Sequence, residues 1–181
     1  MNIPNIISLA RLLSVPVIVW AVSDGRMMLA FWLFVAAGIS DAVDGFIAKR
    51  FNYATELGSF LDPLADKALL VSVYVVLAVE GHLPLWLVIV VVWRDLLIVG
   101  GAILYQTLTQ NLKMAPLLVS KVNTLAQIVL AAYMLARPAL GLEFPWLDTG
   151  LIVLVATTTV VSGVSYVVGW INKATDMEEG R

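Results

Sequence analysis

Four aspartates lie close together in the first half of the chain, in the stretch DAVDGFIAKRFNYATELGSFLDPLAD that runs from residue 41 to residue 66. The chain around them is 61% hydrophobic. Placing one carboxylate at membrane depth costs on the order of 3 kcal/mol, so four of them require compensation by metal ions, basic side chains or a water-filled cavity. The four residues are Asp41, Asp44, Asp62 and Asp66.

The spacing of these aspartates predicts that they converge. On a helix, Asp41 and Asp44 share one face, and so do Asp62 and Asp66. A short polar turn separates the two pairs, so the two helices should pack side by side in opposite directions. Oxygen ligands without cysteine or a nearby histidine suit Mg²⁺ or Mn²⁺. We expect two ions, because one would leave much of the negative charge uncompensated, and a phosphate-bearing ligand bridged through them.

The composition is typical of an integral membrane protein. The 181 residues have a mean hydropathy of +0.94 and only 13% charged residues. The net charge of −2 does not favour nucleic-acid binding. The chain has no cysteine and one histidine, which excludes disulfides, thiol nucleophiles and cysteine-ligated zinc.

Six apolar segments are long enough to cross a bilayer, which predicts an all-α membrane protein with six transmembrane helices. We expect residues 1–181 to form a single domain that ends in a polar tail from about residue 172. The segments are residues 6–22, 27–49, 57–79, 85–108, 116–135 and 146–171.

The loop charges predict that both termini are cytoplasmic, because basic residues gather in cytoplasmic loops. The aspartate stretch would then lie at the cytoplasmic side of the second and third helices. We expect a bacterial inner membrane, since the short segment before the first helix carries no organellar transit signal. The inner residues would be Lys49, Arg50, Lys113, Lys173 and Arg181, and the outer ones Arg26 and Arg137.

The aspartate stretch resembles the signature of the CDP-alcohol phosphotransferases, which reads D-x2-D-G-x2-A-R-x8-G-x3-D-x3-D. The chain matches it from Asp41 to Asp66 with the spacing intact and one departure, Lys49 at the arginine position. Arg50 cannot simply replace that arginine, because one residue turns a helix by about 100°. Lysine keeps the charge for a phosphate contact but lacks the bidentate fork of arginine.

The resemblance implies the membrane fold of that family and a metal-dependent transfer of a phosphatidyl group from a CDP-alcohol to a hydroxyl, with release of CMP. It implies a homodimer, a metal site formed by the four aspartates, and Asp66 as general base. The opening residues NIPNIISLAR resemble the N-x-P-N-x-[LI]-[ST]-x-x-R start of two subfamilies, the phosphatidylglycerophosphate synthases and the CMP-forming cardiolipin synthases. The residues implied to bind the CDP-lipid are Asn5, Gly45, Ala48, Lys49 and Gly58.

Arg11 closes that opening motif, and two interpretations remain open for it. Like Asn5, it could help to bind the CDP-lipid. Alternatively, Asn5 is an interfacial cap and Arg11 is an arginine whose apolar stem lies in the membrane while its charge reaches the interface.

Two later motifs resemble the mitochondrial-type cardiolipin synthases. They are Arg94-Asp95, where glycerophosphate-accepting synthases have R-E, and the stretch SKVNT at residues 120–124, where those enzymes have G-K-x-K-T. This resemblance implies CDP-diacylglycerol as donor and phosphatidylglycerol as acceptor. Asn123 in place of a second lysine suits the single charge of phosphatidylglycerol better than the dianionic phosphate of glycerol 3-phosphate.

Arg94 and Lys121 are therefore expected to bind the acceptor phosphate. The alternative for Arg94 is a structural ion pair with a neighbouring helix, since Asp95 is expected to project elsewhere.

Two other functions also remain open: a phosphatidylglycerophosphate synthase that uses glycerol 3-phosphate, and a cation-coupled transporter with the acids as its ion site. The acids of a transporter are expected near the bilayer midplane, whereas these flank a basic turn.

Overall fold

The computed structural model describes residues 3–51, 56–109, 118–141 and 144–179, with side chains described within 7–43, 64–101, 118–141 and 144–171. Within these ranges the secondary structure is entirely helical, as predicted. The helices are α1 (Ile3–Ser23), α2 (Met27–Phe51), α3 (Glu56–Val79), α4 (Leu85–Thr109), α5 (Leu118–Leu140) and α6 (Pro145–Glu179).

Each helix corresponds to one predicted apolar segment, and the differences lie mainly at the ends of α5 and α6. The fifth predicted segment ends at residue 135, but α5 continues through Arg137 and Pro138 to Leu140. Gly141 follows with a φ of 64°, a left-handed conformation that terminates helices and suits glycine. The polar residues after Ile171, expected as a tail, continue α6 as far as Glu179.

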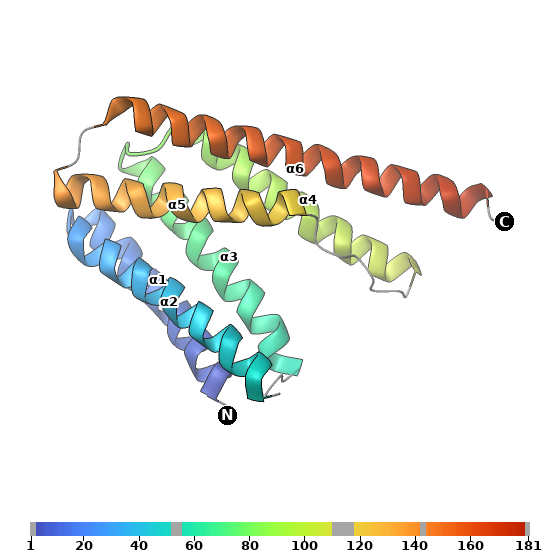
Figure 1. The fold of residues 1–181 in the computed structure, drawn as a ribbon, viewed down its shortest axis with the longest axis horizontal. Helices are drawn as coiled ribbons and strands as arrows, with labels where there is room; N and C mark the ends of the chain where they lie inside the picture. Colours follow the sequence, from blue (N-terminus) through green and yellow to red (C-terminus); the bar gives the residue numbers. More distant parts are fainter. Residues whose placement is uncertain (1–2, 52–55, 110–117, 142–143, 180–181) are drawn as a thin grey trace. The chain divides into compact units, whose positions relative to one another are not determined.

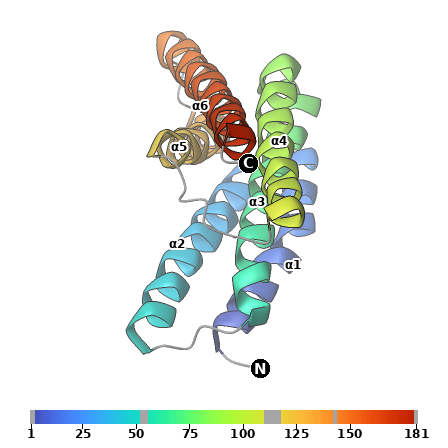
Figure 2. The same ribbon diagram turned by 90° about the vertical axis from the view of Figure 1, so that its right-hand side faces the viewer.

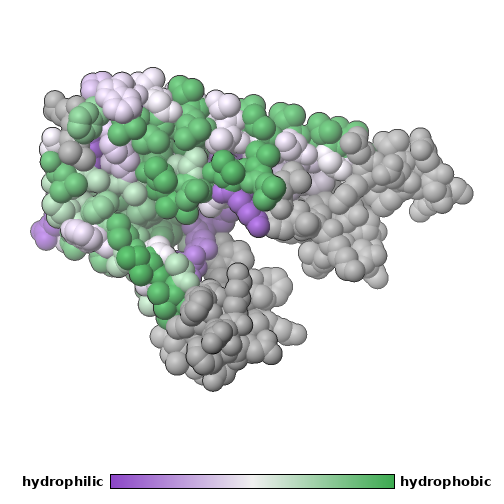
Figure 3. Space-filling model, in the orientation of Figure 1, coloured by the Kyte–Doolittle hydropathy of each residue, from purple (hydrophilic) through white to green (hydrophobic). Residues whose placement is uncertain are grey.

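Among the described residues, two helical segments are long and apolar enough to cross a membrane, Leu118–Leu140 and Pro145–Ile171. Six spans therefore remain a prediction. Large apolar side chains are exposed on all of the helices, for example Trp20 on α1, Trp32 on α2 and Trp93 on α4. Hydrophobic side chains cover much of the described surface in the view of Figure 3. Apolar surface of this extent is typical of a protein that contacts lipid or a partner.

The chain divides into two compact units, residues 1–85 with 131–144, and residues 86–130 with 145–181. The predicted single domain is thus neither confirmed nor excluded. In the first unit, α1 packs against both α2 and α3, which lie beside it in Figures 1 and 2. Its core is mainly apolar and includes Ile18, Val22, Val73, Tyr74 and Leu77.

The second unit contains α4, the first half of α5 and α6. Its interior also holds apolar side chains, such as Leu87, Val91 and Val155. It buries more polar residues than the described part of the first unit, where Ser8 and Arg11 are buried. Those of the second unit are Arg94, Asp95, Asn123, Gln127, Thr159 and Ser162.

Candidate active site

In the first unit, Arg11 of α1 connects two of the four predicted site aspartates. The Nη1 atom of Arg11 lies 2.7 Å from Oδ1 of Asp41 in α2. The same nitrogen donates a hydrogen bond to Oδ1 of Asp66 in α3. Two carboxylates from different helices thus meet at one guanidinium nitrogen, which confirms that the two helices bring Asp41 and Asp66 together.

The burial of the three side chains differs. The Arg11 side chain is 1% exposed, whereas those of Asp41 and Asp66 are 45% and 47% exposed. A buried guanidinium requires a compensating negative charge, because its desolvation is costly. The carboxylates supply that charge, and about half of each of their side chains remains exposed.

The oxygen donors of Asp41 and Asp66 fit a hard divalent cation. Both carboxylates already lie around a single positive group, and oxygen ligands are those that Mg²⁺ and Mn²⁺ prefer. Within the described residues, no cluster of three or more acidic, histidine or cysteine side chains is found. The other predicted site residues are in helices or at their ends, but their side chains lie outside the described part. They are Asn5, Asp44, Gly45, Ala48, Lys49, Gly58 and Asp62.

A pocket of approximately 280 Å³ lies beside Arg11, between α1 and α2. Most of its lining is aliphatic, and its polar lining residues are Arg11, Ser14 and Ser40. Both serine hydroxyls donate to backbone carbonyl oxygens, Ser14 to that of Arg11 at 2.6 Å and Ser40 to that of Ala36 at 2.7 Å. Each hydroxyl oxygen therefore still has capacity to accept a hydrogen bond.

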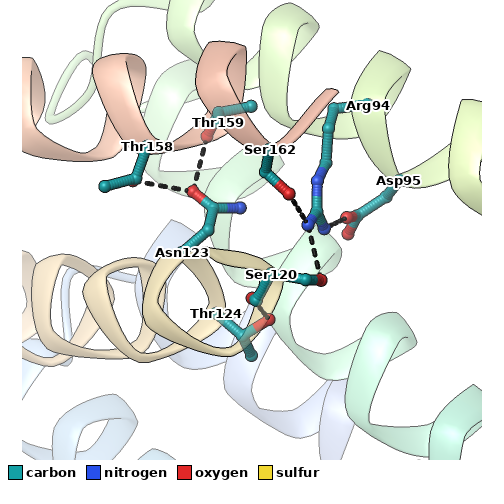
Figure 4. A network of polar contacts seen from close by, with 8 residues as sticks. All are labelled: Arg94, Asp95, Ser120, Asn123, Thr124, Thr158, Thr159 and Ser162. Carbon is teal, nitrogen blue, oxygen red and sulfur yellow. Dashed lines mark hydrogen bonds and ion pairs between the residues drawn. The ribbon is translucent and has the colours of Figure 1, made fainter. Parts of the chain in front are cut away.

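In the second unit, Arg94 is the centre of a polar network that joins three helices (Figure 4). Its Nη1 atom lies 2.8 Å from Oδ1 of Asp95 in the same helix, and its Nη2 atom donates to Ser120 of α5 at 2.6 Å. The same Nη2 atom also donates to Ser162 of α6. Arg94 and Asp95 are both buried, with 4% and 6% exposure.

The expectation that Asp95 projects away from Arg94 is wrong. Neighbouring residues on a helix point about 100° apart, but the long side chain of arginine can bend back to an adjacent carboxylate. The ion pair of Arg94 is therefore made within α4, and its contacts to neighbouring helices go to serine hydroxyls instead.

Asn123 is also part of the packing between α5 and α6. It is completely buried, and its Oδ1 atom accepts hydrogen bonds from Thr158 and Thr159, both at 2.9 Å. Figure 4 shows this amide between the two threonines. Lys121, two residues earlier on the same helix, is exposed. Of the two predicted acceptor-binding residues, Lys121 is accessible and Arg94 is enclosed.

The profile of the CDP-alcohol phosphatidyltransferase family matches residues 1–171, which includes both regions described above. The chain belongs to this family. Membership confirms the predicted family and the predicted enzyme class, a transferase. The CDP-alcohol phosphatidyltransferases are membrane-embedded proteins, in agreement with the apolar composition.

The relatives of the chain carry the names of two different kinds of synthase. The chain is 38% identical to the "CDP-diacylglycerol--glycerol-3-phosphate 3-phosphatidyltransferase 1, chloroplastic" of Oryza sativa subsp. japonica over 92% of its length and 56% of that protein. It is 32% identical to the "Cardiolipin synthase (CMP-forming)" of Homo sapiens over 91% of the chain and 60% of that protein. It is 33% identical to the "CDP-diacylglycerol--glycerol-3-phosphate 3-phosphatidyltransferase" of Bacillus subtilis over 91% of the chain and 93% of that protein.

The chain therefore spans less than two thirds of the rice and human proteins and most of the Bacillus protein. Similar identity to both kinds of relative leaves the acceptor undecided. The most informative residue that the sequence did not assign to the aspartate site is Arg11. One feature of the sequence pointed to this role: Arg11 is a basic residue inside an apolar helix. Such a residue requires a charged partner, and Asp41 and Asp66 provide it from two other helices.

Proposed function

We propose that the chain is a CMP-forming cardiolipin synthase, which transfers the phosphatidyl group of CDP-diacylglycerol to phosphatidylglycerol. The observation that carries this proposal is the position of Asn123. Its side chain is an uncharged amide, enclosed between α5 and α6 and bonded to two threonines. This position therefore offers no cation to a ligand. The described part of α5 before residue 130 then presents one cation, Lys121. A single cation matches the monoanionic phosphodiester of phosphatidylglycerol.

The pocket beside Arg94 is compatible with a lipid acceptor. This pocket of approximately 310 Å³ lies between α4 and α6 and is lined mainly by apolar side chains, among them Trp93, Leu97 and Val164. Its volume and lining are of the kind that a hydrocarbon chain fills. The donor CDP-diacylglycerol has two such chains with either acceptor, and phosphatidylglycerol would bring two more.

The aspartate site would perform the transfer. Asp66 accepts the proton of the acceptor hydroxyl, whose oxygen then forms a bond to the phosphorus of the phosphatidyl group. The bond from that phosphorus to the CMP oxygen breaks, and CMP leaves. Divalent ions held by Asp41, Asp44, Asp62 and Asp66 would supply neutralisation of the charge that develops on the pyrophosphate oxygens.

The CDP-lipid would lie along the small residues of the signature, with Lys49 near its pyrophosphate. Of the acceptor residues, Lys121 is exposed and suited to the incoming phosphate. Arg94 would reach the acceptor through Nε or through the second N–H of Nη1, because Nη2 already donates to two serines. Six membrane spans, cytoplasmic termini in a bacterial inner membrane and a homodimer complete the proposal.

The alternative acceptor is glycerol 3-phosphate, which the names of the rice and Bacillus relatives favour. A phosphatidylglycerophosphate synthase would use the same aspartate site with a smaller acceptor. The transporter interpretation is abandoned, because the family is one of transferases.

The deciding experiment supplies each acceptor separately. Purified protein receives CDP-diacylglycerol with Mg²⁺ or Mn²⁺, and CMP release is measured with phosphatidylglycerol or with glycerol 3-phosphate. We expect release with phosphatidylglycerol alone. Release with glycerol 3-phosphate alone would replace this proposal with the alternative.

The acceptor contact is tested by Lys121→Gln. The variant should raise KM for phosphatidylglycerol about tenfold with little change in kcat, because a hydrogen bond to a charged group contributes roughly 1.5 kcal/mol. Arg26→Gln removes an exposed cation from the turn between α1 and α2 and serves as the control. Equal KM values for the two variants would exclude Lys121 as an acceptor contact.

A further inference from the structure

Arg11 has a geometry that suits a changeable contact better than a permanent one. Its Nη1 atom contacts both Asp41 and Asp66, yet the two carboxylates are each about half exposed. Within the described residues, its buried Nε and Nη2 atoms have no hydrogen-bond partner. Of the three guanidinium nitrogens, Arg11 thus leaves two without a partner in the described part of the chain, whereas Arg94 leaves one.

A metal ion held by the same carboxylates would compete with this contact. An ion coordinated by Oδ1 of Asp41 and Oδ1 of Asp66 would need the oxygens that now surround Nη1. Two cations at one pair of oxygens repel each other strongly in a poorly solvated site. Arg11 and a divalent ion are thus alternative partners of these two oxygens.

The first unit also offers the guanidinium another position. Arg11 itself lines the pocket between α1 and α2, together with Ser14 and Ser40. Both serine oxygens can accept a hydrogen bond, since their protons are donated to backbone carbonyls. The pocket therefore contains two hydroxyl oxygens beside Arg11 as alternative acceptors for its guanidinium.

We propose that Arg11 is a built-in counter-cation, which holds Asp41 and Asp66 together in the metal-free protein and releases them when a divalent ion binds. Arg11 is then a positioning residue. It stabilises the arrangement of Asp41 and Asp66 before a metal ion binds, and it competes with that ion for their oxygens. This inference rests on the proposed function only in assigning Asp41 and Asp66 to the metal site.

The test measures Mn²⁺ binding to purified protein without substrate, by calorimetry or by the loss of the free-ion signal in electron paramagnetic resonance. Arg11→Met should bind Mn²⁺ about tenfold more tightly than the wild type, equivalent to 1.4 kcal/mol. Arg26→Met removes the same formal charge from an exposed turn and should leave the affinity unchanged. Arg11→Lys keeps the charge on a shorter side chain, so its affinity should lie between those of the wild type and Arg11→Met.

Thermal unfolding provides the second measurement. Without metal, Arg11→Met should unfold at a lower temperature than the wild type, and saturating Mn²⁺ should close most of that gap. If Arg11→Met does not fold, Arg11→Lys alone carries the test, with tighter Mn²⁺ binding than the wild type as the required result. Unchanged or weaker Mn²⁺ binding in the folded variants would overturn the proposal.

The outcomes separate this inference from the proposed function. If neither the wild type nor the Arg11 variants bind Mn²⁺, the counter-cation proposal is wrong. If the variants bind Mn²⁺ more tightly but the wild type releases no CMP with either acceptor, the proposed function fails and the role of Arg11 stands.

Discussion

The two units each bury an arginine, and the two arginines are neutralised in different ways. Arg11 contacts carboxylates on two other helices, and those carboxylates remain about half exposed. Arg94 contacts its own neighbour Asp95, which is buried as well, and bonds to two serines. The first arrangement leaves acidic surface open to a ligand, whereas the second encloses its charges.

This difference indicates distinct roles for the two regions. A buried ion pair contributes little to stability compared with apolar packing, but removing one partner of such a pair is strongly destabilising. The Arg94 network therefore holds α4, α5 and α6 in one arrangement, and a substitution there should act mainly on folding. The carboxylates near Arg11 can exchange their cationic partner, so substitutions there should act mainly on ligand binding and turnover.

The largest expected effect is that of Asp66→Asn on turnover. Loss of the general base should lower kcat about 10²–10⁴-fold while the variant remains folded and still binds CDP-diacylglycerol. CMP release and nucleotide-lipid binding measure the two properties. The control is Asp24→Asn. This variant removes an exposed carboxylate that pairs with Arg26 in the turn between α1 and α2. Normal turnover by Asp66→Asn would show that another group accepts the proton.

Arg94→Met tests the enclosed region. The substitution removes the arginine from a buried carboxylate, so the free energy of unfolding should fall by about 3–5 kcal/mol. Denaturation in detergent measures this loss. The double variant Arg94→Met/Asp95→Leu should be more stable than Arg94→Met, because it removes both buried charges. A variant of wild-type stability with a raised KM for the acceptor would instead make Arg94 a phosphate contact.

The smallest expected effect comes from two adjacent glycines in α4. A Cβ atom at Gly101 would overlap the ring of Trp170 in α6, whereas one at Gly100 meets nothing within 4 Å. Gly101→Ala should therefore destabilise the second unit by about 1–3 kcal/mol, the usual cost of overpacking. Gly100→Ala should unfold at or above the wild-type temperature, because alanine favours a helix more than glycine does. Equal unfolding temperatures for the two variants would show that the indole moves aside without cost.

Much of the helical layout could be predicted from hydropathy, because a long apolar segment determines its own backbone structure locally. Each predicted segment became one helix, and the spacing of Asp41 and Asp66 correctly placed both on faces that meet. The errors lay at helix ends, as at Pro138, where a proline near the last turn did not stop α5. A helix end depends on local capping as well as composition, and Gly141 provides the turn that terminates α5.

The sequence by itself determined the family, the six helices and the acidic signature, since all three depend on residue types at fixed spacing along the chain. Only the tertiary structure decided the partners of Arg11 and Arg94 and the burial of Asn123. Those depend on which helices pack together and on how long side chains bend between them. A guanidinium inside an apolar chain must find negative charge or hydrogen-bond acceptors, but spacing along one helix does not say which neighbouring helix supplies them.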